Sequence, residues 1–230
     1  MSDKIGKIYI VATPIGNLGD ITFRAIEALK AADLILCEDT RVTKKLLDHY
    51  TIQKPLLSYH QRSGLSRVEK IVEYIEEGKT LALVTDAGTP GISDPGNELV
   101  GMLLEHFGKD LEIVPIPGAS ALACLCQVAG INLSKFTFMG FPPNKKGRET
   151  FFKKVIVSEY PVIFYESPHR FMKNLELLSK LSSDPLKLVV GRELTKMFEE
   201  VKRGNLEEVK KYYEDNPDKV RGEFVVIVYK

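Results

Sequence analysis

Short apolar runs alternate along the first half of the chain with segments in which apolar residues recur every three or four positions. Runs of this length, rich in β-branched residues, predict buried strands near residues 7–12, 34–37, 56–58, 80–84 and 111–114. The intervening periodicity predicts helices after Asp20, near 40–49, near 66–77 and after Asp94, with Pro95 in the first helical turn. Strands and helices that alternate through short joints indicate a mostly parallel sheet covered by helices.

The second half predicts a further α/β unit. Strands are expected near 136–139, 161–165, 186–190, 197–203 and 223–229, and helices near 119–129, 148–157, 168–180 and 205–215. The last run, FVVIVY, is uniformly apolar and is therefore expected at the centre of its sheet. We place the domain boundary between residues 117 and 118, which gives an N-terminal α/β domain (1–117) and a C-terminal α/β domain (118–230).

Composition narrows the class of protein. With 44% hydrophobic and 27% charged residues among 230, the chain has the composition of a globular protein. No apolar stretch approaches the roughly 20 residues of a membrane-spanning helix, and no apolar signal region follows Met1, so we expect a cytoplasmic protein with no membrane partner. The three cysteines, Cys37, Cys124 and Cys126, lack the spacing of a disulfide framework or a zinc site, so no metal is expected.

Charge is distributed unevenly. The formal net charge is +1, but acidic residues are in excess before residue 118 and basic residues after it. Near-neutrality gives no support for nucleic-acid binding by the whole surface, although a local basic face could bind it.

Three loops rich in glycine and proline, at residues 13–20, 85–96 and 115–121, each follow a predicted strand and precede a predicted helix. In an open parallel sheet such loops lie at the carboxyl edge, where ligands bind, so we expect them to converge on one cleft. Asp86, directly after a strand, could accept hydrogen bonds from a ligand or could stabilise its own turn. The sequence contains no P-loop, dinucleotide-binding, zinc-protease or serine-hydrolase motif.

Several longer sequence motifs also occur in a recognisable order: ATPIGNLGDIT, CEDTR, SYH, DAGTPGISDPG, PGASA and YESPHR. Together they resemble the bacterial ribosomal RNA small subunit methyltransferase I family of the tetrapyrrole methylase superfamily, from about Lys7 to Tyr229. The resemblance implies two αβα domains with S-adenosylmethionine in the cleft between them. It further implies methylation of a cytidine ribose 2′-hydroxyl in the 16S rRNA of the 30S subunit, and a homodimer.

Carried over position by position, the resemblance places the methyl-donor site on Pro14, Ile15, Asp86, Gly88, Ser120, Ala121, Tyr165, Arg192 (or Gly191) and Gly222. Superfamily members that act on tetrapyrroles commonly have a more glycine-dense first loop and a GDP-type second loop. The sequences TPIG and DAGTP favour the RNA-modifying branch over a tetrapyrrole-precursor C-methyltransferase. A non-catalytic ribosome-binding protein is a further alternative.

Methyl transfer to a hydroxyl is an in-line displacement for which placement contributes about 7–11 kcal/mol. A general base typically adds roughly 10²- to 10⁴-fold. Candidates for the base are Glu38, Asp39, His60 and Glu166, with His169 nearby. Each has a structural alternative: Glu38 and Asp39 could begin a helix, His60 could be a surface histidine, and Glu166 could cap a helix or orient the donor or the ribose.

Candidate RNA contacts lie at two places. Arg41 could pair with a neighbouring carboxylate or hold an RNA phosphate. Lys145, Lys146 and Arg148, with two further lysines at 153 and 154 and Glu149 as the only acid, follow the aromatic segment that begins at Phe141. Basic and aromatic residues together are typical of RNA binding, although a solvated helix face is the alternative.

Overall fold

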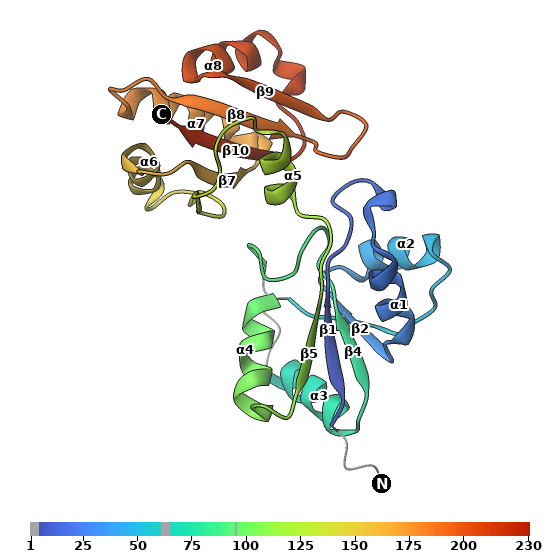
Figure 1. Ribbon diagram of the computed structural model, residues 1–230. Helices are drawn as coiled ribbons and strands as arrows, with labels where there is room; N and C mark the ends of the chain where they lie inside the picture. The colour runs from blue at the N-terminus through green and yellow to red at the C-terminus, as the bar shows by residue number, and fades with distance from the viewer. Residues whose placement is uncertain (1–4, 61–64, 95) are drawn as a thin grey trace. The chain divides into compact units, whose positions relative to one another are not determined.

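The computed structural model describes residues 5–60, 65–94 and 96–230, and Pro95, predicted in the first turn of a helix, lies outside them. The chain divides into two compact units, Met1–Ser120 (unit 1) and Ala121–Lys230 (unit 2). This division lies three residues after the boundary expected from the sequence. Each unit consists of one β-sheet and the helices that pack on it (Figure 1).

Unit 1 contains a five-stranded sheet in which every neighbouring pair is parallel. The strands are β1 (Lys7–Val11), β2 (Leu34–Cys37), β3 (Leu56–Ser58), β4 (Thr80–Leu83) and β5 (Glu112–Ile116), in the spatial order β3-β2-β4-β1-β5. The helices are α1 (Phe23–Ala31), α2 (Thr40–His49), α3 (Leu65–Glu76) and α4 (Gly96–Phe107), with a short 3₁₀ turn, η1 (Leu18–Asp20). The parallel sheet predicted for the first half is confirmed.

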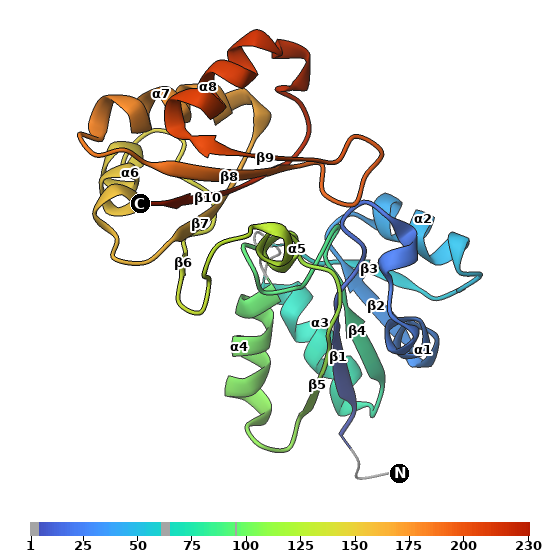
Figure 2. The same cartoon turned by 45° about the horizontal axis from the view of Figure 1, so that its top comes forward.

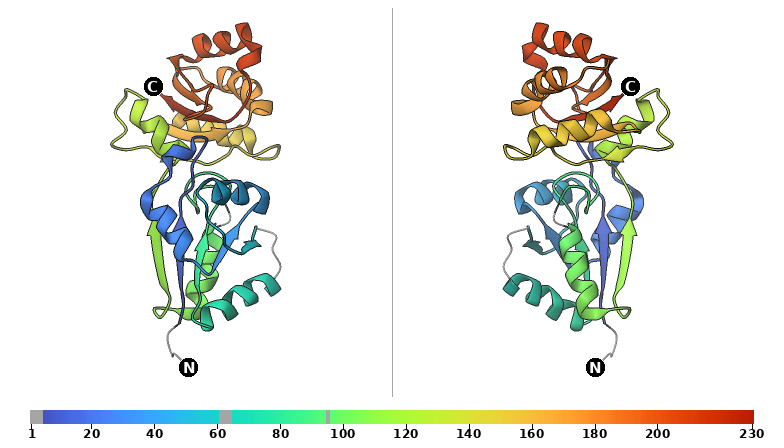
Figure 3. Two further views of the ribbon diagram at one scale, coloured as in Figure 1. Left: turned by 90° about the vertical axis from the view of Figure 1, so that its right-hand side faces the viewer. Right: turned by 90° about the vertical axis from the view of Figure 1, so that its left-hand side faces the viewer.

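Both faces of this sheet are buried, which explains its continuous apolar strands. In β2, Leu34 and Leu36 join the core formed with α3 and α4, whereas Ile35 and Cys37 join the core formed with α1 and α2. Successive side chains of a strand point to opposite faces, so a strand between two helical layers must be apolar at every position. Figure 3 shows the helices on the two sides of the strands.

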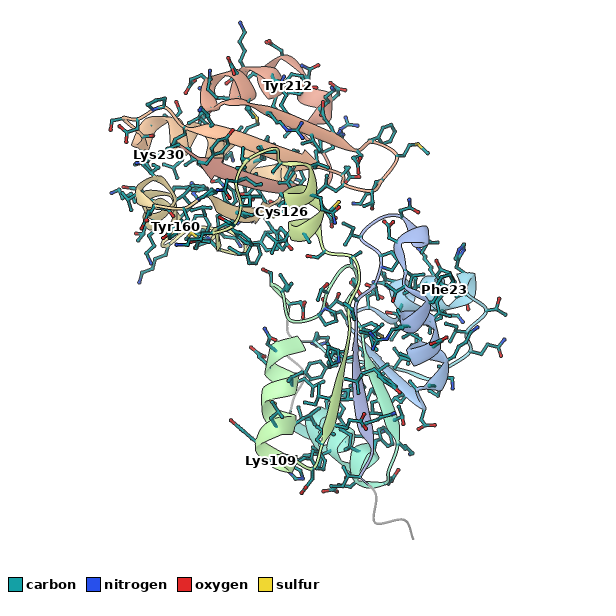
Figure 4. All side chains as sticks on the ribbon, in the orientation of Figure 1. Phe23, Lys109, Cys126, Tyr160, Tyr212 and Lys230 are labelled. Carbon is teal, nitrogen blue, oxygen red and sulfur yellow. The ribbon has the colours of Figure 1, made fainter. Side chains whose placement is uncertain are left out.

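One helix start differs from the prediction. Thr22, not Asp20, caps α1: its hydroxyl accepts a hydrogen bond from the Ala25 amide at 3.1 Å. Asp20 instead ends the preceding 3₁₀ turn. Phe23, which matches the helical period, is 87% exposed and lies on the outside of unit 1 (Figure 4), because alanines and Leu29 form the buried stripe of this helix.

Unit 2 contains a mixed five-stranded sheet. Its strands are β6 (Thr137–Phe138), β7 (Val162–Glu166), β8 (Lys187–Arg192), β9 (Glu200–Asn205) and β10 (Phe224–Tyr229), in the order β6-β7-β10-β8-β9. Only β6 and β7 are parallel; the other pairs are antiparallel. The central position predicted for the last strand is confirmed. The strand predicted at 197–203 begins later, at Glu200, because residues 193–199 form a loop in which Glu193 and Thr195 have positive φ.

Four helices belong to unit 2: α5 (Ala121–Val128), α6 (Arg148–Val157), α7 (Pro168–Leu181) and α8 (Leu206–Asp215), with a 3₁₀ turn, η2 (Pro217–Lys219). Alternate residues of β10, beginning with Phe224, pack in one core with α6, α7 and α8, and α5 contacts the same strand. Figure 2 shows this central strand among the other strands of unit 2. Among the described residues, no helix is both long and apolar enough to span a bilayer.

Candidate active site

The first two glycine- and proline-rich loops of unit 1 are bonded to each other. Thr13 and Gly88 exchange both backbone hydrogen bonds, at 2.9 and 3.1 Å, and the Thr13 hydroxyl donates to the Thr85 carbonyl at 3.2 Å. Gly88 has a φ of +89°, and a Cβ there would lie 3.3 Å from the Ile15 side chain. Glycine permits both the backbone conformation and the close approach.

The third loop joins the other two. The Thr89 hydroxyl donates to the Ala119 carbonyl at 3.0 Å, and a Cβ on Gly118 would lie 2.9 Å from the Cβ of Ala12. The three loops therefore meet at the carboxyl edge of the sheet in unit 1, as the sequence predicted. Of the expected donor-binding residues, Pro14 and Ile15 are buried in the first loop, and Ser120 is half-buried at the end of the third.

The second loop is also held from within. Both carboxylate oxygens of Asp94 accept a hydrogen bond from the Gly91 amide at 2.8 Å, and one of them accepts a bond from Gly96 at the same distance. The side-chain amide of Asn97 donates to the Gly91 carbonyl at 2.6 Å. A loop held in this way can present its backbone groups to a ligand without losing much conformational entropy on binding.

Carboxylates gather beside these loops. Asp86 accepts a hydrogen bond from the Asp39 amide at 3.0 Å, which places it next to the end of β2, where Glu38 lies. Burial, followed by the negative charges of Asp86 and Asp94, raises the pKa of Glu38. Like charges that raise a carboxyl pKa create a negative potential, and this potential favours a bound cation.

Asp39 has a structural role. It caps α2, accepting the Arg41 amide at 2.8 Å, and its carboxylate pairs with the Arg41 guanidinium at 2.6 Å. Hydrogen bonds from Arg41 lower the pKa of Asp39 to about 2, so this carboxylate is a weak proton acceptor. For both residues the structure supports the helix-start and carboxylate-pair interpretations.

His60 lies on the exposed side of the same edge. It follows β3, whose Ser58 is in register with Cys37 of β2, so His60 and Glu38 both lie just beyond the ends of neighbouring parallel strands. The Ser58 hydroxyl donates to the Glu38 carbonyl at 3.2 Å and so holds these two strand ends together.

The predicted residues of unit 2 also share one sheet edge. Phe224 of β10 is in register with Glu166 of β7 and with Arg192 of β8, so the ends of these three strands meet. Tyr165 lies one residue before Glu166, and Gly222 two residues before Phe224. Ala121 is the first residue of α5, a helix whose Leu125 would lie 2.8 Å from a Cβ on Gly191 of β8.

The carboxylate of Glu166 is buried and hydrogen-bonded within unit 2, an environment that does not suit a general base. Its side chain is fully buried and accepts the Ser167 amide at 2.7 Å, while Asn174 donates to its second oxygen and Arg170 lies 3.2 Å away. Both oxygens are therefore occupied at the start of α7, which supports the helix-entry interpretation. The exposed His169 follows in the same turn.

The Arg192 side chain is similarly occupied. Its guanidinium donates to the carbonyls of Arg221 and Phe198, each at 3.1 Å, and thereby holds the strand ends of unit 2 together. Gly222 has a φ of +79°, and a Cβ there would lie 2.2 Å from the Glu193 carboxyl carbon. These contacts shape the ends of the strands of unit 2.

The predicted basic cluster is smaller than its sequence suggests. Lys153 pairs with Glu149 one turn away at 2.6 Å, and this pairing lowers the pKa of Glu149. Lys145 and Lys146 are exposed in the loop before α6, and Arg148 begins that helix. Lys154 in α6 is exposed as well, so Lys145, Lys146 and Lys154 are the exposed lysines of this segment outside the pair with Glu149.

Sequence reasoning missed several polar side chains that hold the loops and strand ends in place, namely Thr13, Ser58, Thr89, Asn97 and Arg170. Threonine, serine and asparagine are common turn residues, so their type alone does not show which carbonyl they contact. Within the part of the chain that the structure describes, no group of three histidine, cysteine or acidic side chains could hold a metal ion.

Comparison with known proteins is consistent with this arrangement. Residues 7–210 match the family model for Tetrapyrrole (Corrin/Porphyrin) Methylases. The chain is 43% identical to Ribosomal RNA small subunit methyltransferase I of Bacillus subtilis, over 97% of this chain and 75% of the relative. It is 42% identical to the protein of the same name from Synechocystis sp., over 97% and 79%.

Solved structures support the fold. The crystal structure of the methyltransferase CobJ has a TM-score of 0.68 and 21% sequence identity, covering 97% of this chain and 93% of that chain. At this level of identity the likeness concerns architecture alone.

Proposed function

Because the chain belongs to the ribosomal RNA small subunit methyltransferase I family, within the tetrapyrrole methylases, we propose that it methylates the 2′-hydroxyl of a cytidine ribose in 16S rRNA. It is an S-adenosylmethionine-dependent methyltransferase. The observation that carries the proposal is the meeting of three stiff loops beside Glu38 and Asp86 in unit 1. A tetrapyrrole-precursor methyltransferase is not favoured, because the relatives that match almost the whole chain are named as rRNA enzymes.

The residues fit a donor with two positive groups. S-adenosylmethionine carries a sulfonium and an ammonium, and it supplies the methyl group as an electrophile. Glu38 and Asp86 provide the negative potential at the carboxyl edge of unit 1, while Gly88 allows close approach of the backbone. We assign Pro14, Ile15 and Ser120 of unit 1 to the donor site, and we propose Ala121, Tyr165, Arg192 and Gly222 of unit 2 as further donor contacts.

The reaction needs a proton acceptor and good placement. In the displacement, a bond forms between the ribose oxygen and the methyl carbon while the carbon–sulfur bond breaks, and the hydroxyl proton leaves. We assign that proton to Glu38, because its raised pKa makes it a better acceptor than an ordinary carboxylate and because Asp39 and Glu166 have their oxygens occupied. His60 is the second candidate, at the end of the adjacent strand.

The RNA would be held by Lys145 and Lys146 of the loop before α6 and by Arg148, the first residue of that helix. Side chains of this kind neutralise phosphates, and the binding they provide weakens with salt. We further propose that the substrate is the 30S particle or its rRNA, that two copies of the chain form the active enzyme, and that it works in the cytoplasm.

The test is methyl transfer to a defined acceptor. Purified full-length protein is incubated with tritiated S-adenosylmethionine and 30S subunits that lack the modification, and the digested rRNA is analysed for 2′-O-methylcytidine by mass spectrometry. We expect label in that nucleoside and none in uroporphyrinogen offered as an alternative acceptor. Label in the tetrapyrrole, or no label in rRNA at any salt concentration, would reject the proposal.

A further inference from the structure

The loop between β6 and α6, residues 140–147, presents an aromatic side chain and two cations together. Phe141 is 51% exposed, and its ring is tilted by 54° against that of Tyr165 with 5.3 Å between ring centroids. Tyr165 in turn contacts Phe138 at 5.0 Å. Lys145 and Lys146 are exposed in the same loop. We refer to this segment as the aromatic-basic loop.

The loop is conformationally restricted. Gly140 and Gly147, at its two ends, have φ values of +63° and +89°, which favour glycine. Pro142 and Pro143 fix two φ angles between them, and Pro142 is buried. The backbone thus turns sharply at both ends and is stiff in the middle.

Arg170 ties this loop to α7. Its guanidinium donates to the Pro142 carbonyl at 2.8 Å and to the Asn144 side chain, and its Nε donates to the Ser167 hydroxyl at 3.1 Å. A terminal nitrogen lies 3.2 Å from Glu166. All three nitrogens of the guanidinium are therefore used inside the protein, in a fork geometry that a lysine ammonium cannot reproduce.

Glu166 provides the fixed end of this tie. Its side chain is fully buried, and bonds from Ser167 and Asn174 hold the carboxylate at the end of the strand. A buried ion pair contributes little net stability because desolvation offsets much of the attraction, so its presence is weak evidence for a stabilising role. Here Arg170, held by Glu166, contacts Pro142 and Asn144, which lie 28 and 26 residues before it in the chain.

We propose that the Glu166–Arg170 pair is a positioning device that fixes the aromatic-basic loop for single-stranded RNA. In this arrangement the exposed side of Phe141 stacks on an unpaired base, while Lys145 and Lys146 neutralise adjacent phosphates. The inference rests on the proposed function, since it takes RNA as the partner. A half-exposed aromatic ring beside two exposed lysines matches an unstacked base and its phosphates, whereas a duplex keeps its bases inside the stack.

The test measures binding of a short fluorescein-labelled single-stranded RNA, and of the same strand annealed into a duplex, to full-length protein. Base stacking on an aromatic ring is worth about 1–3 kcal/mol, so Phe141→Ala should weaken single-strand binding about 5- to 100-fold and duplex binding much less. Phe141→Tyr should restore binding. Phe23→Ala, which removes an even more exposed ring from α1, is the control and should have no effect.

Arg170 is tested by a double-mutant cycle. If Arg170 acts through the loop, then Arg170→Lys should weaken binding although it keeps the charge, and the double variant with Phe141→Ala should be little weaker than Phe141→Ala alone. In kinetics with 30S subunits, the KM for RNA should rise more than kcat falls. Circular dichroism and thermal melting check that Arg170→Lys is folded.

Several results would overturn the inference. Wild-type affinity in Phe141→Ala, full binding by Arg170→Lys, or additive losses in the double variant would each show that Arg170 does not position Phe141 for a base. These outcomes differ from failure of the proposed function, because they can occur while the wild-type protein still methylates 30S subunits. If the wild-type protein transfers no methyl group to rRNA, the proposed function itself fails.

Discussion

Asp86→Asn is the most informative change in the proposed donor site. The substitution removes one negative charge but keeps an Oδ1 that can accept the Asp39 amide, now bonded at 3.0 Å. The second loop should therefore keep its place, since its other bonds, through Thr13 and Asp94, do not involve Asp86. Any loss of donor affinity then reports the charge rather than the fold.

The expected magnitude follows from the exposure of the site. Asp86 is exposed before a ligand binds, so its attraction for a cation acts at an effective dielectric of about 20 or higher, where unit charges about 4 Å apart gain up to about 4 kcal/mol. Measured hydrogen bonds to charged groups are worth about 1.5–3 kcal/mol. At about 1.4 kcal/mol per factor of ten, we expect the dissociation constant of the donor to rise about 10- to 100-fold.

Isothermal titration with two ligands identifies the group that Asp86 recognises. S-adenosylmethionine and S-adenosylhomocysteine both carry the ammonium, but only the former carries the sulfonium charge. Equal weakening for both ligands indicates the ammonium, and weakening confined to S-adenosylmethionine indicates the sulfonium. Unchanged affinity for both ligands would refute the reasoning. Asp48→Asn, an equivalent change on the exposed surface of α2, is the control.

Stability supplies an independent check on the same variant. Burial and, after it, the charge of Asp86 raise the pKa of Glu38, so at neutral pH these two carboxylates repel each other in the folded protein. Asp86→Asn should leave the melting temperature unchanged or raise it. A clear fall in melting temperature would show that the loop needs the charged group, and the affinity loss could no longer be assigned to the donor.

Three further changes test separate features. The pKa of Glu38 is raised in the folded protein, so the contribution of Glu38 to stability is present below its ordinary pKa and is lost as the pH rises through the raised pKa. Glu38→Gln should therefore raise the melting temperature near neutral pH, and this gain should fade in acid. The same substitution should lower the rate of methylation. Lys145→Gln with Lys146→Gln should flatten the slope of log affinity against log salt by about 1.4 for a single strand, which is about a sevenfold smaller loss over a fourfold rise in salt. Gly88→Ala should cost about 1–2 kcal/mol and weaken donor binding, because its φ is +89° and Ile15 lies 3.3 Å from the added methyl.

Matched variants separate these effects from general damage. For Glu38, a stability gain that persists undiminished below pH 4 would contradict the linkage argument. For Lys145 and Lys146, the control is Lys30→Gln with Lys109→Gln, two exposed lysines of unit 1 that lie before the starts of β2 and β5 (Figure 4 labels Lys109). An equal change of the salt slope in both double variants would show that the loop lysines do not contact the RNA. For Gly88, the control is Gly101→Ala in α4, where an added Cβ meets nothing within 4 Å.

The sequence by itself determined the order of the elements and the meeting of the three glycine- and proline-rich loops. Continuous apolar strands such as β2 require helices on both faces, and this requirement predicted the parallel sheet of unit 1. A parallel sheet brings the carboxyl ends of its strands to one edge, so the meeting of the three loops followed from topology and loop chemistry. The ordered sequence motifs identified the family, and the family implied S-adenosylmethionine as the methyl donor.

Only the tertiary structure decided which polar side chains are available. Glu38 and Asp39 are adjacent in sequence, yet burial and neighbouring acids raise the pKa of Glu38, whereas Arg41 lowers that of Asp39 to about 2. Glu166 is one more acid at a strand end in the sequence, but in the fold its oxygens are occupied by Asn174 and its neighbours. Proton affinity depends on burial and on charges brought close by the fold, and local sequence does not contain those distances.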